Sequence, residues 1–102
     1  MRPRSKKMDA TYRQRRALVA RLLEERPWCE VCQQLRATEN PDALVLPSHD
    51  VHEVLRRSAG GDILDPANCL VVCRPHHDRI HRSPTWAMER GFLKSRYGRD
   101  GV

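Results

Sequence analysis

Two short pairs of potential zinc ligands, Cys29-x2-Cys32 and Cys73-x2-His76, constrain the fold of this chain more than any other feature. Zinc takes four nitrogen or sulfur ligands at the corners of a tetrahedron, so the two pairs can share an ion only where the chain folds back on itself. The 40 residues between the pairs must therefore form a compact unit, for which a hairpin is the simplest arrangement. We predict a structural zinc site made of Cys29, Cys32, Cys73 and His76.

A second combination of ligands joins Cys29 and Cys32 to His77 and His81, as in a two-cysteine, two-histidine finger. The 44 residues between Cys32 and His77 weigh against this alternative. A DNA-reading finger has only about 12 residues there. The fourth cysteine, Cys69, lies in an apolar run, and we expect it to be a small buried residue without a metal.

Size and charge limit the class of protein. The chain has 102 residues, of which 39% are hydrophobic, so it holds one domain whose small core needs a staple such as a metal. Lysine and arginine number 19 against 13 acidic residues, which gives a net charge of +6. A basic balance of this kind favours a polyanionic partner, with nucleic acid ahead of membrane lipid.

The chain shows no sign of a membrane or secretory role. The basic start MRPRSKK has no apolar segment after it, and no apolar run approaches the roughly 20 residues that span a bilayer. We therefore expect no membrane partner and a cytoplasmic location, which is the host cytoplasm if a phage encodes the chain. Thiols stay reduced there, so the CxxC pair indicates metal binding or redox chemistry and not a disulfide framework.

Hydrophobic periodicity and turn residues predict a small α+β fold. We expect a polar turn around Asn40-Pro41 after the second cysteine, and a strand hairpin with a long loop marked by Gly60-Gly61. The expected segments are a basic flexible arm over residues 1–10, a helix from about Thr11 to about Glu25, short strands in 44–46 and 49–55, a strand over 69–72, helices over 74–82 and 85–91, and a basic tail over 96–102.

Three of the five histidines can form a second metal site. His77 and His81 are four residues apart in the expected helix and project from one face, whereas the neighbouring His76 points about 100° away. His52 would reach the same place from a strand. A site with three protein ligands leaves positions for water and substrate, which a closed structural site does not.

The run VHEVLRRSAGG…DPANCLVVCRPHHDRIH resembles the HNH endonuclease family, the ββα-metal nucleases, in the form that carries a zinc knuckle. The resemblance extends from Trp28 to His81. It implies a ββα-metal (His-Me finger) fold with flanking helices over residues 11–95, and metal-dependent cutting or nicking of DNA with low sequence specificity. Stand-alone chains of this kind occur in phages near DNA packaging genes, so it also implies terminase or other packaging proteins as partners.

The resemblance assigns roles to individual residues. His52, His77 and His81 match the ligands of one catalytic divalent ion, which can be Mg²⁺, Mn²⁺, Ni²⁺ or Zn²⁺. Asn68 matches an asparagine that braces the loop between the strands by hydrogen bonding to the backbone. Glu53 occupies the position at which the family usually has a histidine that acts as general base.

Glu53 is a departure from the family pattern, since a carboxylate with an ordinary pKa of about 4.3 is the weaker base. Two alternatives remain open: Glu53 binds the metal, or His49 is the base. In a regular strand both side chains point away from the face of His52, unless the strand ends or bends there, as nearby Pro47 allows. We favour Glu53 over His49.

Arg56, Arg57 and Arg74 flank the expected site and are candidates for contacts to DNA phosphates, which position a duplex without reading its sequence. Two other functions compete with the nuclease. One is a zinc-stabilised DNA-binding module that has weak catalysis or none, which the glutamate at position 53 favours. The other is a structural adaptor in a packaging or repair complex.

Overall fold

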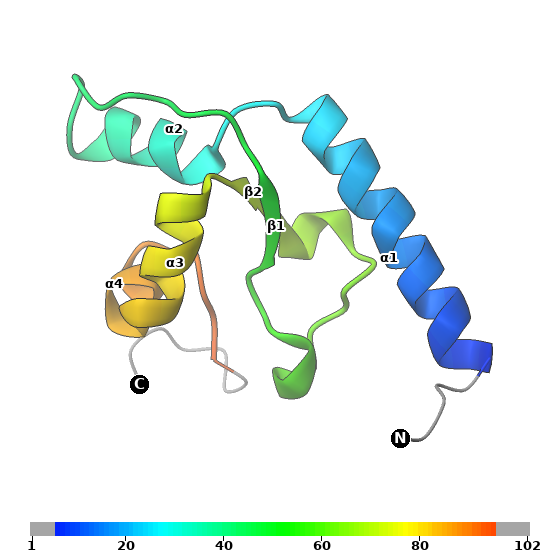
Figure 1. Cartoon of the computed structure of the whole chain (residues 1–102). Helices are drawn as coiled ribbons and strands as arrows, with labels where there is room; N and C mark the ends of the chain where they lie inside the picture. The colour runs from blue at the N-terminus through cyan, green and yellow to red at the C-terminus, as the bar shows by residue number, and fades with distance from the viewer. Residues whose placement is uncertain (1–5, 96–102) are drawn as a thin grey trace.

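The structure is a computed structural model that describes residues 6–95, and it forms a small α+β fold built around one two-stranded antiparallel sheet. One long helix lies on one side of the sheet, and three shorter helices lie on the other (Figure 1). The elements in chain order are α1 (Lys6–Glu25), α2 (Glu30–Thr38), β1 (Asp50–Glu53), the 3-10 turns η1 (Arg57–Ala59) and η2 (Pro66–Asn68), β2 (Cys69–Val72), α3 (Arg74–Arg82) and α4 (Pro84–Glu89).

The predicted hairpin is confirmed. β1 and β2 pair in an antiparallel register that sets Asp50 opposite Val72 and Glu53 opposite Cys69. The long loop between them turns at Gly60, whose φ of 96° favours glycine. A Cβ on Gly61 would collide with the backbone carbonyl of Leu55, so the glycine pair is required by the loop.

The helix α1 begins earlier than the sequence predicts. It starts at Lys6 and not near Thr11, so residues 6–10, which we assigned to the flexible arm, are helical. Lysine, methionine and alanine there are good helix formers, and Asp9 in the first turn suits the positive end of the helix dipole. Residues 1–5 and the predicted tail at 96–102 lie outside the described part of the chain.

Between the cysteine pair and β1, the expected turn around Asn40-Pro41 is present, but two other features differ from the expectation. The segment directly after Cys29 is the helix α2, which the Cys29 side chain caps by accepting a hydrogen bond from the Cys32 backbone N–H at 3.3 Å. Leu44–Leu46 is not a strand: Leu44 is 80% exposed, and the nearest pairing is an isolated bridge from Trp28 to Pro47. Pro47 has no N–H with which to continue a ladder.

The core lies on both faces of the hairpin. On the α1 side, Leu18 and Leu22 pack against Cys69 and Val71, which confirms that Cys69 is a buried structural residue. On the opposite side, the other three cysteines pack with Val31, Val72, Ile80, Ala87, Phe92 and Leu93. The predicted helices α3 and α4 close this second cluster, and Gly91, with a φ of 80°, follows α4.

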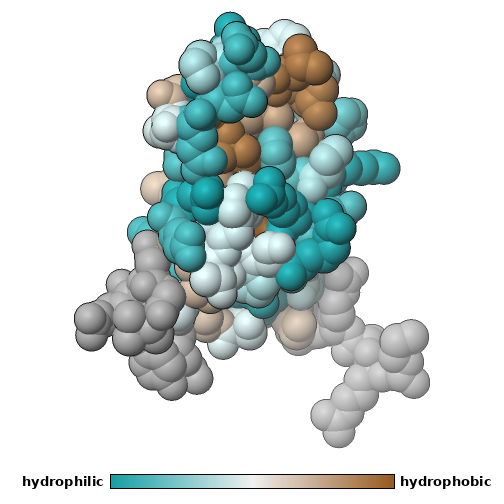
Figure 2. Space-filling view, turned by 90° about the vertical axis from the view of Figure 1, so that its left-hand side faces the viewer, coloured by the Kyte–Doolittle hydropathy of each residue, from teal (hydrophilic) through white to brown (hydrophobic). Residues whose placement is uncertain are grey.

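The outer surface on the α2, α3 and α4 side is mostly hydrophilic, with hydrophobic groups gathered toward one end (Figure 2). Large exposed hydrophobic residues include Trp28, Leu44 and Leu46, which lie in the segments before and after α2. Among residues 6–95, no helix combines the length and apolar character needed to cross a membrane.

Candidate functional site

The predicted cluster of three cysteines and one histidine is present, and each ligand pair stands at the start of a helix. Cys29 precedes α2, and Cys73 precedes α3. The Sγ atoms of Cys32 and Cys73 are 3.9 Å apart, and His76 Nδ1 lies 3.3 Å from each of them and 3.9 Å from Cys29 Sγ. A zinc tetrahedron needs about 3.8 Å between sulfurs and about 3.6 Å from sulfur to nitrogen. The cluster therefore fits a metal ion such as zinc.

Burial changes the protonation of three of these side chains. Burial raises the pKa of Cys73 to about 12 and also raises the pKa of Cys32, so binding of a metal ion to these thiols would release protons. Burial, together with the charge of Arg79, lowers the pKa of His76 and keeps its imidazole neutral. Trp86 stacks on that imidazole with 6.4 Å between ring centroids.

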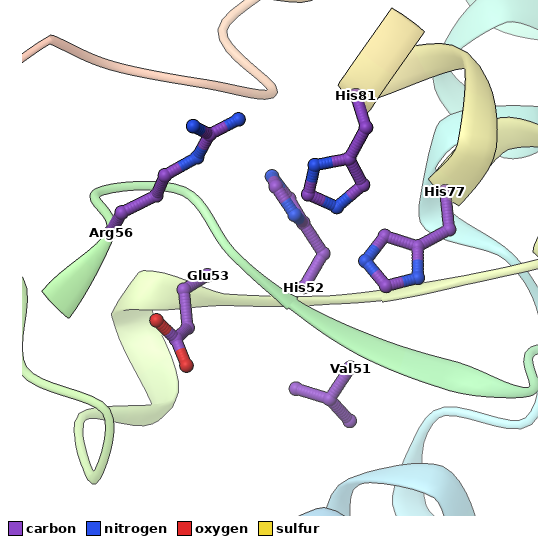
Figure 3. Close-up of a pocket in the computed structure, with 6 residues that line it drawn as sticks. All are labelled: Val51, His52, Glu53, Arg56, His77 and His81. Atoms are coloured by element: carbon purple, nitrogen blue, oxygen red, sulfur yellow. The ribbon is translucent and has the colours of Figure 1, made fainter. Parts of the chain in front are cut away.

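The second predicted cluster, His52, His77 and His81, is also brought together. One nitrogen from each ring lies within 4.8 Å of the other two, which is close enough to share a metal ion. His52 comes from β1 and the other two from successive turns of α3, and all three rings converge in Figure 3. His76 belongs to the cysteine cluster and His77 to this one, so the two-cysteine, two-histidine finger is wrong.

Two of the three imidazoles are oriented by a partner at their other nitrogen. His52 Nε2 lies 2.7 Å from the backbone carbonyl of Phe92, which only accepts, so this nitrogen donates and Nδ1 keeps the lone pair. His77 Nδ1 donates in the same way to Asp50 Oδ2 at 3.2 Å, which leaves Nε2 as the ligand atom. Such outer partners are typical of metal-binding histidines.

Sequence reasoning missed both partners. Asp50 lies two residues before His52 on the same face of β1, so the strand period of two would have found it. Phe92 contributes a carbonyl group from a segment beyond α4, and no side-chain pattern indicates that contact.

Burial favours the neutral form of two of the three imidazoles. The pKa of His52 is lowered to about 4, mainly by burial and also by the nearby His77, His81 and Arg56. Burial also lowers the pKa of His81. At neutral pH these two rings carry a lone pair and not a proton, which is the state that binds a metal.

The three histidines line a pocket of about 280 Å³, together with Val51, Glu53 and Arg56. Arg56 lies at its edge, with an exposed side chain. Of the other two predicted phosphate contacts, Arg57 turns toward α1 and donates to the Tyr12 hydroxyl at 2.9 Å. Arg74 is exposed on the first turn of α3 and does not line this pocket.

Glu53 lines the pocket, but its carboxylate points away from the three imidazoles in Figure 3. Its Oε1 instead lies 3.4 Å from Arg15 Nη2 on α1. No Glu53 oxygen belongs to the group of atoms that could share an ion, so the alternative in which Glu53 binds the metal finds no support. His49 is exposed and does not line the pocket, so of the two candidates for the base only Glu53 borders the three histidines.

Asn68 braces the loop as expected. Its Oδ1 accepts from the Leu55 backbone N–H at 2.8 Å, and its Nδ2 donates to the carbonyls of Leu55 at 2.9 Å and Asp62 at 3.2 Å. One side chain thus ties the segment after β1 to the start of β2.

No protein-family model, curated protein sequence or solved structure matches this chain.

Proposed function

We propose that this chain is a metal-dependent DNA endonuclease or nickase of the HNH type, with a ββα-metal fold formed by β1, β2 and α3. One observation carries the proposal: three imidazoles, two of them oriented by Phe92 and Asp50, converge on one pocket. Three protein ligands leave room for water and for a phosphate oxygen, as hydrolysis requires.

The donor set suits a divalent ion. Imidazole nitrogen favours Zn²⁺ and Ni²⁺, Mn²⁺ is compatible, and Mg²⁺ would keep water in most of its shell. When bound, such an ion supplies positive charge that stabilises the transition state of phosphodiester hydrolysis. The chain's own task is to hold three imidazole rings in place, which the Phe92 carbonyl and the Asp50 carboxylate serve.

The remaining pocket residues have distinct tasks in this proposal. Glu53 takes a proton from the attacking water, and Arg56 binds a phosphate beside the metal. Asn68 fixes the backbone of Leu55, two residues after Glu53, and so limits where that carboxylate can stand. Arg57 and Arg74 would contact phosphates farther away. By resemblance, the products carry a 5′ phosphate and a 3′ hydroxyl.

DNA is the proposed substrate because the chain carries a net charge of +6 and its candidate contacts are arginines. Arginines that hold phosphates position a duplex but do not read bases, so we expect little sequence preference. A partnership with phage terminase or other packaging proteins in a host cytoplasm rests on the resemblance alone.

A supercoiled plasmid assay across Mg²⁺, Mn²⁺, Ni²⁺ and Zn²⁺ tests the proposal. We expect relaxed or linear DNA with at least one metal and none after EDTA. His77→Ala should lower the rate by about 100-fold or more, because the site loses a ligand. His49→Ala is the matched control, since His49 is exposed and outside the pocket. Cleavage by His77→Ala at the wild-type rate would refute the assignment.

A second function is favoured by one observation. The Glu53 carboxylate is paired with Arg15 and turned from the imidazoles, which suits a zinc-stabilised DNA-binding module with weak or no catalysis. A gel shift of duplex DNA without cutting under any of the four metals would select this alternative.

A further inference from the structure

Arg15 is a largely buried cation on α1, a helix that lies outside the ββα unit. It stands three residues before Leu18 and seven before Leu22, so all three share the face of α1 that packs on the hairpin. Its side chain is only 14% exposed. A guanidinium removed from water to this extent needs acceptors for its hydrogen atoms and an opposite charge nearby.

The surroundings hold this guanidinium in one place. Nη1 donates to the backbone carbonyl of Ile63 at 2.8 Å and to the Sγ atom of Cys69 at 3.3 Å. The first acceptor belongs to the loop between the strands, and the second belongs to β2. Because both acceptors belong to the folded hairpin, the direction of the second guanidinium nitrogen, Nη2, is fixed as well.

The Nη2 atom of Arg15 forms an ion pair with Glu53. Nη2 lies 3.4 Å from Oε1 of a carboxylate that is itself 25% exposed. Within residues 6–95 this is the only ion pair that Glu53 forms. Successive side chains of a strand point to opposite faces, so Glu53 projects toward α1 while His52 projects toward α3. Glu53 nevertheless borders the pocket of the three histidines, because β1 ends at this residue.

We propose that Arg15 is a positioning residue for Glu53: α1, through one guanidinium anchored to Ile63 and Cys69, sets where the water-activating carboxylate stands beside the metal pocket. The inference rests on the proposed nuclease function. It adds α1 to a catalytic apparatus otherwise contained in β1, the loop and α3.

A simpler role is a structural ion pair that fastens α1 to β1. The two roles differ in what the loss of Arg15 does. A structural role lowers stability and lowers every activity in proportion to the folded fraction. A positioning role lowers the turnover rate of folded protein, leaves DNA and metal affinity unchanged, and adds nothing once Glu53 has been removed.

The experiment is a double-mutant cycle on plasmid cleavage with Arg15→Met, Glu53→Gln and the double variant. We expect Glu53→Gln to lower kcat by about 100-fold or more, and Arg15→Met to lower it by about 10- to 100-fold. The double variant should cleave within about 3-fold of Glu53→Gln. KM for plasmid and the zinc content should match the wild type. Arg21→Met is the control, since Arg21 is an exposed α1 arginine paired with Glu25.

Several outcomes would overturn the inference. One is an unchanged kcat for Arg15→Met. Another is a double variant whose loss in kcat equals the product of the losses of the two single variants. If Arg15→Met does not fold, Arg15→Lys keeps the cation without the fork and replaces it in the cycle. The inference is then supported if Arg15→Lys lowers kcat and if the double variant with Glu53→Gln cleaves no more slowly than Glu53→Gln alone. An unchanged kcat for Arg15→Lys overturns it. If the wild-type chain cleaves plasmid with none of the four metals, the nuclease function and this inference are refuted together. A wild-type chain that cuts while Glu53→Gln also cuts normally refutes the inference alone.

Discussion

At the scale of single residues, Asp50 shows how a side chain outside the three-histidine cluster sets the orientation of one of its rings. Its carboxylate accepts the Nδ1 hydrogen of His77 and so turns Nε2 toward the cluster. Such partners set the ring orientation and raise the basicity of the ligand nitrogen. A histidine without this partner can rotate or bind the metal through the wrong nitrogen.

We therefore expect Asp50→Ala to weaken binding of Mn²⁺ or Ni²⁺ to the three-histidine site by about 10- to 100-fold. Isothermal titration of zinc-loaded protein measures the dissociation constant. Asp78→Asn is the matched control, because Asp78 is an exposed carboxylate next to His77 on α3. Equal affinities for Asp50→Ala and wild type would show that the hydrogen bond does not support the site.

The buried His52 predicts a dependence of stability on pH. Burial lowers its pKa from 6.5 to about 4, so its contribution to stability is fully present above pH 6.5 and is lost as the pH falls toward 4. The loss is on the order of 3 kcal/mol. We expect the free energy of unfolding of wild type, without a second metal, to fall more steeply between pH 6.5 and 4.5 than that of His52→Gln. Urea denaturation measures both, and equal slopes would contradict the prediction.

Some site residues were predictable, and others depend on tertiary structure. His77 and His81 follow from helical spacing, and the split between His76 and His77 follows from the 100° step of a helix. Arg15 could not be predicted as the partner of Glu53, because its contact depends on how α1 rotates against the hairpin. The orientation of Glu53 likewise depends on where β1 ends.

At the scale of elements, the sequence predicts the segments that have strong patterns and misses the helix α2, whose start depends on the cysteine–histidine cluster. β2, α3 and α4 were predictable from an apolar run, from a helical histidine pair and from Ser83-Pro84. The helix α2 was missed because its start depends on the Cys29 side chain as a cap, which is unusual for a cysteine. A strand was wrongly predicted at 44–46 because these residues form an apolar run. In the structure Leu44 and Leu46 are exposed, and the pairing near them is an isolated bridge at Pro47.

The cluster of Cys29, Cys32, Cys73 and His76 joins α2 to α3, and the larger of the two core clusters forms around its cysteines. A structural zinc contributes about 10 to 16 kcal/mol in small domains. This equals or exceeds the total stability of about 5 to 15 kcal/mol of most proteins. Cooperative folding of this chain should therefore depend on the metal.

We predict that Cys73→Ser loses zinc and the cooperative thermal transition, as followed by metal analysis and circular dichroism. Cys69→Ala is the control, since Cys69 is equally buried but outside the cluster. It should keep one zinc per chain and lose only about 1 to 2 kcal/mol, as expected for a small buried side chain. A folded, zinc-free Cys73→Ser protein would show that the core forms without the metal.

At the scale of the whole molecule, affinity for DNA depends on the net charge of +6 and on where individual arginines lie on the surface. Each cation that neutralises a DNA phosphate releases a counterion, so the logarithm of affinity falls with the logarithm of salt concentration by about 0.9 per contact. The slope therefore counts contacts without the need to know the DNA sequence. It also separates an arginine that touches DNA from one that only adds to the overall charge.

Arg56 is the arginine for which this test is sharpest, because it lines the metal pocket and is exposed. In the His77→Ala background, which prevents cutting, we expect Arg56→Ala to weaken duplex binding and to reduce the salt slope by about 1. Arg36→Ala removes an equal charge from α2, where Arg36 lines a different pocket with Trp28 and Leu44, and it should leave the slope unchanged. Equal slopes for both variants would mean that DNA does not cross the three-histidine pocket, and the proposed substrate would then have no path to the metal.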